Sequence, residues 1–168
     1  NHAKYKMGLT WLMTLRGIPQ IYYGTELAVK NFKNPSDAEV RKDFVGGWKT
    51  DVQNKFKASD RTPLEQETYD FVKKLATIRR NSEAITEGKF KQFAPFQDGV
   101  YVYFRYTDKQ RVMVISNTST QSQQIPLNRF QEVLKGATKA TNLLTNEVVD
   151  LEKMTLKSTD FLLLEIQN

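Results

Sequence analysis

The feature that most constrains the fold is a change in the period of the apolar residues near residue 85. From Leu64 to Ile78 they recur every three or four positions, as on one face of a helix. Beyond Ile85 they recur mostly at every second position, in short runs separated by turn residues, which is typical of an antiparallel sandwich. We expect strands at residues 100–106, 111–116, 124–127, 138–144, 148–151, 154–156 and 161–166.

The N-terminal residues indicate a helix followed by a buried strand. Residues 3–16 carry apolar side chains at helical spacing, and Gly17 is a typical helix stop. Residues 18–23 form a nearly continuous apolar and aromatic run, which favours a strand buried on both faces. Together they predict one αβ unit of a barrel or a doubly wound sheet.

A second helix is predicted over residues 63–80. Thr62 is a suitable N-cap, Pro63 suits the first helical position, and Glu65 completes a capping box. The polar stretch before it, residues 24–61, is a loop of a length that is usually functional or disordered.

The composition excludes several function classes. The 168 residues include no cysteine, which rules out disulfides, thiolate catalysis and cysteine-ligated zinc. The net charge of +6 comes from Lys and Arg residues that are interleaved with acidic ones, so we predict a solvated surface and no nucleic-acid partner. The longest apolar runs are too short for a membrane span, and no signal peptide is recognised.

The motif Gly17-Ile-Pro-Gln-Ile-Tyr-Tyr-Gly-Thr-Glu26 resembles the eighth barrel strand of the α-amylase family, written G-x-P-x-I-Y-Y-G-x-E. Residues 37–48 resemble the D-x-x-x-R element that follows this strand. Their Gly-Gly-Trp ending is most similar to bacterial cyclomaltodextrinases, neopullulanases and starch-utilisation amylases. The helix from Pro63 is similar to the eighth barrel helix of the family. The region that begins at about residue 86 is similar to the family's C-terminal sandwich.

The resemblance implies a mixed fold class with two parts. Residues 1–84 would form the incomplete end of a catalytic (β/α)8 barrel, namely its last strand and the flanking helices. Residues 85–168 would form the C-terminal all-β antiparallel sandwich. Because barrel enzymes place their sites at the carboxyl ends of the strands, the loop after residue 24 would face substrate. A bacterial periplasmic or extracellular location is favoured, and a cytoplasmic one stays open.

The same resemblance implies that the chain carries no catalytic residue. Retaining glycosidases use two carboxyl groups about 5 Å apart. In the family these and a third acidic residue come from earlier strands, so all three would precede Asn1. Asn1-His2 matches the start of the family's Asn-His-Asp motif, but Ala3 departs from it. We therefore expect the chain alone to be inactive.

Without catalytic residues, the residues of the loop could still bind substrate. In the family, the residues that correspond to Asp37 and Arg41 hydrogen-bond a glucose unit; the alternative is a surface i,i+4 pair. Trp48 would be either a sugar-stacking platform or a loop anchor. Glu26 would make either a structural hydrogen bond at the barrel rim or a contact with substrate. We expect no metal site or cofactor in this chain, although calcium is possible in the full-length parent.

Three functions are compatible with these observations. The first is a fragment of a glycoside hydrolase acting on α-glucans such as starch, maltooligosaccharides, cyclodextrin or pullulan. The second is a non-catalytic carbohydrate-binding module, for which Tyr101, Tyr103 and Tyr106 could offer a sugar-binding face; cross-strand packing is the ordinary explanation for such tyrosines. The third is an amylase-like interaction module, as in amino-acid transporter ectodomains.

A barrel strand without its neighbours would expose two unpaired edges. Such an edge is a template for pairing with another chain. We therefore expect a possible homodimer through residues 5–24, or else a rearrangement of this stretch against the sandwich.

Overall fold

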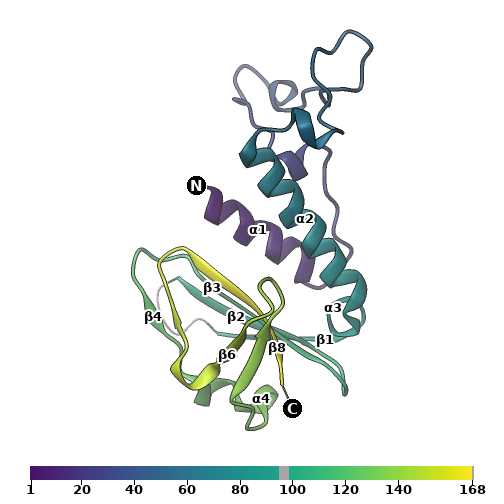
Figure 1. Cartoon of the computed structure of the whole chain (residues 1–168). Coiled ribbons are helices and arrows are strands. Elements are labelled where there is room, and N and C mark those ends of the chain that lie inside the picture. Colours follow the sequence, from purple (N-terminus) through teal and green to yellow (C-terminus); the bar gives the residue numbers. More distant parts are fainter. Residues whose placement is uncertain (95–98, 168) are drawn as a thin grey trace. The chain divides into compact units, whose positions relative to one another are not determined.

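The computed structural model describes residues 1–94 and 99–167 (Figure 1). The chain forms two compact units. The first contains Asn1–Pro19 and Lys74–Asn168, and the second contains Gln20–Lys73. The predicted boundary at residues 84/85 falls inside the first unit. This boundary refers to the domains of the complete parent protein and remains a prediction, because the two units are defined by contacts within this chain alone.

The first unit is built on a six-stranded antiparallel sheet. Each strand pairs antiparallel with its neighbours, and β3 pairs with the distant β8 so that Val114 lies opposite Leu163. This pairing places the last strand of the chain inside the sheet. In spatial order the strands are β1 (Lys89–Phe93), β2 (Val100–Tyr106), β3 (Arg111–Asn117), β8 (Asp160–Ile166), β5 (Lys139–Asn142) and β6 (Val148–Asp150).

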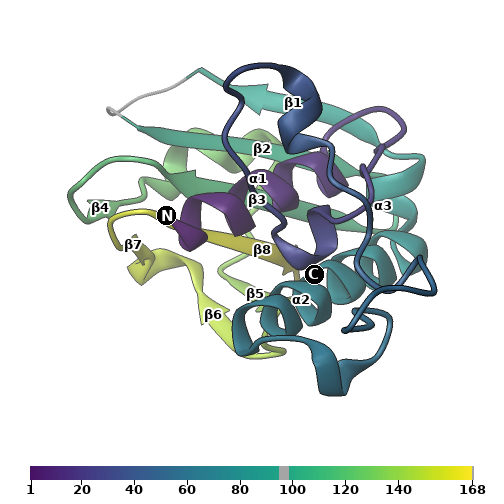
Figure 2. The same cartoon turned by 90° about the horizontal axis from the view of Figure 1, so that it is seen from above.

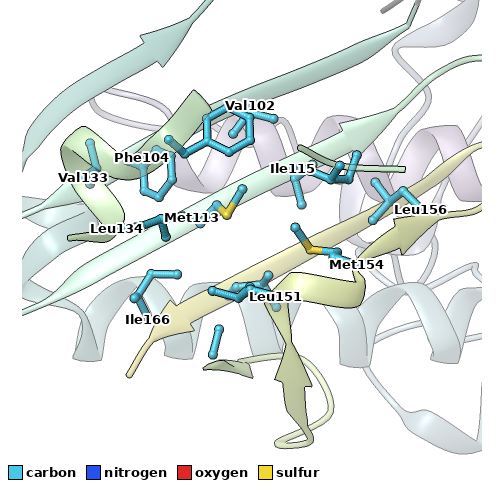
Figure 3. Packing of buried hydrophobic residues seen from close by; sticks show 14 of the residues in the cluster. Val102, Phe104, Met113, Ile115, Val133, Leu134, Leu151, Met154, Leu156 and Ile166 are labelled. Atoms are coloured by element: carbon cyan, nitrogen blue, oxygen red, sulfur yellow. The ribbon is translucent and has the colours of Figure 1, made fainter. Parts of the chain in front are cut away.

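The main hydrophobic core covers one face of this sheet, as Figure 3 shows. Phe104, Met113 and Leu164 point into it from neighbouring strands, in agreement with the period-two pattern. The opposing layer consists of short helices and a two-stranded sheet. These elements are η4 (Leu127–Phe130), α4 (Gln131–Leu134), η5 (Leu151–Lys153), β4 (Gln123–Gln124) and β7 (Thr155–Leu156).

The predicted sandwich is therefore confirmed only as an antiparallel β domain. Residues 127–134 are helical, whereas the sequence predicted a strand at 124–127 and no element at 128–134; the observed strand β4 is limited to Gln123–Gln124. The spacing of Leu127, Phe130 and Leu134 is that of a short helix, and the latter two side chains are fully buried. Their burial on the sheet supplies what a four-residue helix lacks in intrinsic stability.

The opposite face of the sheet is covered by α1 (His2–Thr14), as Figures 1 and 2 show. The helix agrees with the predicted one at residues 3–16. The side chain of Asn1 caps it by accepting hydrogen bonds from the backbone N–H groups of Ala3 and Lys4. Met7, Leu9 and Met13 are buried.

The tyrosines of β2 take part in this packing. The hydroxyl of Tyr103 lies 2.6 Å from the Thr14 hydroxyl, and its side chain is fully buried. Tyr101 makes an edge-to-face contact with Trp11 and donates a hydrogen bond to Gln92. Packing, rather than a sugar-binding face, is therefore the role of these two tyrosines.

The strand predicted at residues 18–23 does not form. Among the described residues this segment pairs with no strand, and Ile18 is 97% exposed. An isolated extended segment has no ladder partner for its backbone groups, so hydrophobicity alone does not make it a strand.

The second unit is mostly the long loop that the sequence predicted. Before α2 begins, this unit contains three single-turn helices, η1 (Thr25–Leu27), η2 (Asp37–Val40) and η3 (Ala58–Asp60). Carboxylates order the rest. Asp51 accepts hydrogen bonds from the N–H groups of Gly46 (2.7 Å) and Trp48 (3.1 Å), and Asp60 accepts one from Asn54 (2.8 Å).

The loop ends at the N-terminus of α2 (Pro63–Asn81), where the predicted capping box is confirmed. Glu65 accepts from the Thr62 N–H at 2.6 Å, and the Glu65 N–H donates to the Thr62 hydroxyl at 3.3 Å. Lys55, which is 7% exposed, donates to the Glu65 carboxylate at 2.8 Å and to the Asp60 carbonyl. A partly buried ion pair therefore attaches the loop to the helix.

None of the helices in the described part of the chain is long and apolar enough to cross a membrane.

The core prediction is tested by Phe104→Ala. The side chain is fully buried among the sheet and α4, so its removal leaves a cavity and should lower the free energy of unfolding by about 3–5 kcal/mol. Urea denaturation followed by circular dichroism measures the change. Val148→Ala, at a residue that is 62% exposed, is the control and should stay within about 0.5 kcal/mol of wild type. A loss below about 1 kcal/mol for Phe104→Ala would contradict this packing.

The Lys55–Glu65 pair predicts a pH dependence of the loop. Burial by itself raises the pKa of Glu65, but the hydrogen bonds from Lys55 and Thr62 outweigh it and leave the pKa below its ordinary value. A lowered folded-state pKa contributes stability above the unfolded pKa of about 4.3, and this stability is lost as the pH falls through the folded value.

Hydrogen exchange of residues 54–66 should therefore be slower in wild type than in Glu65→Gln at pH 6, after correction for intrinsic exchange rates. The difference should shrink below pH 4. The pKa of Asp60 is also lowered, through the Asn54 N–H, but this contribution is common to both proteins. A difference that is independent of pH would mean that the ion pair does not hold the loop.

Candidate functional site

The second unit encloses an open groove of about 580 Å³ that lies directly after the segment 18–23. One side is formed by residues around Gly24, whose φ of +85° is a conformation that favours glycine and turns the chain into η1. The other sides come from the loop after η2 and from the start of α2. The lining residues are Tyr22, Tyr23, Gly24, Thr25, Leu27, Ala28, Val29, Lys30, Val40, Lys42, Asp43, Phe44, Val45, Lys55, Thr62, Leu64 and Glu65.

Two stacked tyrosines form the aromatic part of the groove. The rings of Tyr22 and Tyr23 lie 4.3 Å apart at an interplanar angle of 29°, and both side chains are about half exposed. The hydrogen bond with Tyr22, followed by partial desolvation and the nearby Asp43 carboxylate, raises the pKa of Tyr23. The Tyr23 hydroxyl is therefore protonated at neutral pH.

Charged groups lie beside these rings. Asp43 accepts a hydrogen bond from the Trp48 indole N–H at 3.2 Å. The positive charge of Arg41 lowers the pKa of Tyr23, whereas the negative charge of Asp43 raises it. The structure thus places Asp43 and Tyr23 in the lining of one groove, with Trp48 held by Asp43, whereas Arg41 is not among the lining residues. Trp48 anchors the loop through its N–H, while 63% of the residue stays exposed.

Asp37 lies apart from this group. It pairs with Lys33 at 3.0 Å, and both side chains are more than half exposed. In the part of the chain that the structure describes, no ion pair joins Asp37 to Arg41. The reason is the geometry of η2, since a 3₁₀ helix has three residues per turn and does not align positions i and i+4. The surface i,i+4 pair considered from the sequence is therefore not formed.

Glu26 is half-buried within η1. Its expected hydrogen bond is not made to any residue in ranges 1–94 and 99–167. The hydrogen bond predicted for Glu26 at the barrel rim would need a partner residue from another part of the parent protein.

The position of Asp43 in the groove was not predicted from the sequence. The only signal available was its spacing five residues before Trp48, which permits the indole hydrogen bond. The contribution of Lys42, Lys55 and Leu64 to the lining depends on how the loop folds back onto α2, and no local pattern encodes that.

The groove offers positioning contacts rather than a pair of free carboxyl groups. Of its two acidic side chains, Asp43 is bonded to Trp48 and Glu65 is paired with Lys55. Within the described residues, no group of three or more His, Cys, Asp or Glu side chains could hold a metal ion. Stacked aromatic rings beside an arginine and a carboxylate can bind the faces and hydroxyls of a sugar.

Comparisons with known proteins identify the family to which the β-sheet region is similar. Residues 90–165 match the family described as the cyclo-malto-dextrinase C-terminal domain. The chain is 32% identical over 119 residues to a cyclomaltodextrin glucanotransferase of Geobacillus stearothermophilus, covering 71% of this chain and 14% of that protein. It is 26% identical over 160 residues to neopullulanase 2 of Thermoactinomyces vulgaris, covering 95% of this chain and 24% of that protein.

A solved structure shows the same fold. The AmyP E221Q variant in complex with maltotriose superposes with a TM-score of 0.73 at 16% identity, over 99% of this chain and 35% of that chain. The chain therefore spans between about a seventh and a third of the proteins it matches here. From these matches and the fold, the β-sheet region is a cyclo-malto-dextrinase C-terminal domain, and the chain corresponds to the C-terminal part of an α-amylase-family glycoside hydrolase.

Proposed function

We propose that the complete protein to which this chain belongs is a glycoside hydrolase acting on α-glucans, and that residues 20–65 supply part of its substrate-binding site. The relatives are named for cyclomaltodextrin and pullulan chemistry, which supports an α-glucan over other polysaccharides. The chain contributes sugar-positioning groups in this proposal, and Arg41 is the central one.

The observation that carries the proposal is the grouping of Tyr22, Tyr23 and Asp43 around one groove, whose lining includes Val40 and Lys42 on either side of Arg41. Aromatic rings suit the apolar faces of glucose units, and charged side chains make the stronger hydrogen bonds to hydroxyls. Asp37 and Arg41 remain the proposed glucose-binding pair, each contacting the sugar separately. Trp48 is proposed as a further stacking surface, and Glu26 as a rim contact.

The exposed apolar residues support a missing barrel. Soluble monomers rarely expose so many large apolar side chains close together in the sequence. We infer that earlier strands and helices of the parent cover them and that residues 18–23 pair there as the last barrel strand. The exposed residues are Ile18, Tyr22, Tyr23, Val29, Phe32, Val40, Val45, Trp48, Val52, Phe56 and Leu64.

The remaining partners follow from the same proposal. The catalytic acids, and calcium if the parent uses it, would come from the part of the protein before Asn1. A homodimer through residues 5–24 stays a prediction. Within one chain α1 already packs on the sheet, so only the later part of that range, including Ile18, is exposed for pairing.

A non-catalytic carbohydrate-binding module is the second candidate. The exposed indole of Trp48 favours it, because sugar stacking needs an accessible aromatic face. The two candidates differ in whether the complete protein turns over glucan, so activity of the complete protein decides between them.

The chain alone should not hydrolyse α-1,4-glucans, since a glycosidase needs two free and correctly spaced carboxyl groups. Reducing-sugar release from soluble starch and from cyclodextrin measures this, beside a boiled sample of the same protein. Release well above the boiled sample would overturn the proposal that the catalytic acids lie elsewhere.

In the complete protein, Arg41→Ala and Asp37→Asn should each lower kcat/KM on maltooligosaccharides by roughly tenfold to a hundredfold. This corresponds to the loss of one charge-assisted hydrogen bond, about 1.5–3 kcal/mol. Lys49→Ala, at an exposed residue of the same loop, is the control and should be kinetically normal. Normal kinetics for both site variants would remove them from the substrate site.

A further inference from the structure

The C-terminal end of α1 is held by two arginines from other elements. The last carbonyls of a helix have no partner within it and must be satisfied from outside. Arg79 of α2 donates to the carbonyls of Met13 and Gly17, both at 2.8 Å. Arg105 of β2 donates to those of Thr14 (3.3 Å) and Leu15 (3.1 Å).

Arg105 is an unusual residue for a strand. It is 2% exposed, and among the described residues it pairs with no carboxylate. The contacts with Thr14 and Leu15 use Nη1 of the guanidinium, and its second terminal nitrogen, Nη2, donates to the Gly88 carbonyl at 2.9 Å. A buried cation is costly unless it is well bonded, so here the helix carbonyls and the negative end of the helix dipole must compensate the charge.

The fork geometry of the side chain is needed for this arrangement. A guanidinium presents several donors in one plane and can reach three carbonyls at once, whereas a lysine presents one compact ammonium. Tyr103 adds a third contact to the same helix end through the Thr14 hydroxyl. The β-sheet domain thus fixes the last turn of α1 with two side chains of one strand.

The fixed helix end leads directly to the groove. Tyr22 lies five positions after Gly17, a distance along the chain of at most about 18 Å. Gly17 itself, with φ of +119°, has its carbonyl held by Arg79. The position of Gly17 therefore limits where Tyr22 and Tyr23 can be placed.

We propose that Arg105 and Arg79 are positioning residues through which the C-terminal β-sheet domain and α2 together fix the start of the substrate-binding segment. The first half of this inference, the fixation of the end of α1, is independent of the proposed function. The second half, its effect on substrate, rests on the proposed function.

The first half is tested by hydrogen exchange on the chain itself. In Arg105→Met and in Arg79→Met, the amides of residues 13–15, which are the hydrogen-bonded ones at the end of α1, should exchange about tenfold to a hundredfold faster than in wild type. Arg105→Lys should behave as Arg105→Met does. Arg80→Met, at the exposed neighbour of Arg79, is the matched control and should match wild type. Amides of β3 and β8 should stay protected, which separates local release from global unfolding.

Tryptophan fluorescence provides a second readout if a variant is too unstable for exchange. The chain has two tryptophans, so Trp48→Phe leaves Trp11 as the reporter of α1 packing. Release of α1 should increase quenching of Trp11 by acrylamide. Wild-type exchange at residues 13–15 together with unchanged Trp11 quenching, in both arginine variants, would overturn the inference.

The second half is tested in the complete protein. Arg79→Met should raise KM for maltooligosaccharides more than it lowers kcat, because positioning of substrate rather than chemistry is affected. Equal kinetics for Arg79→Met and Arg80→Met would overturn it. If the wild-type complete protein shows no α-glucan turnover, the proposed function fails, and the exchange experiment still decides the fixation of the end of α1.

Discussion

The pairing of β3 with β8 is the constraint on which the first unit depends. It joins strands about fifty residues apart in the sequence, and residues 112–116 of β3 are buried on both faces as a result. Two covering layers are therefore required. The segment between β4 and β7 supplies one, and α1 supplies the other from the opposite end of the chain. The β-sheet domain thus requires a helix that, by resemblance, belongs to the catalytic barrel.

Most local structure could be predicted because single residues encode it. Thr62, Pro63 and Glu65 define the start of α2, and alternation defines β2 and β3. The run at residues 18–23 misled the prediction, because a strand depends on partners and not on its own hydrophobicity. The helical turns at 127–134 were missed, because four residues give too short a pattern to separate from a strand.

The candidate site could be predicted as a region but not as a geometry. The G-x-P-x-I-Y-Y-G-x-E motif located the loop, and Asp37 and Arg41 were chosen from their resemblance to the family's D-x-x-x-R element. The 3₁₀ geometry of η2 separates these two residues, while the fold of the following loop brings Asp43 to Tyr23 and Trp48. Such contacts depend on turns held by Asp51 and Asp60, whose partners are backbone N–H groups and leave little trace in the sequence.

The two outer strands of the large sheet have a consequence for the behaviour of the protein in solution. β1 carries lysines at positions 89 and 91, and β6 is only three residues long. Charged and short edges discourage strand addition from another molecule. A sheet with such edges does not polymerise through its backbone, so a domain of this kind can be appended to the end of a large enzyme without making the enzyme prone to fibrous aggregation.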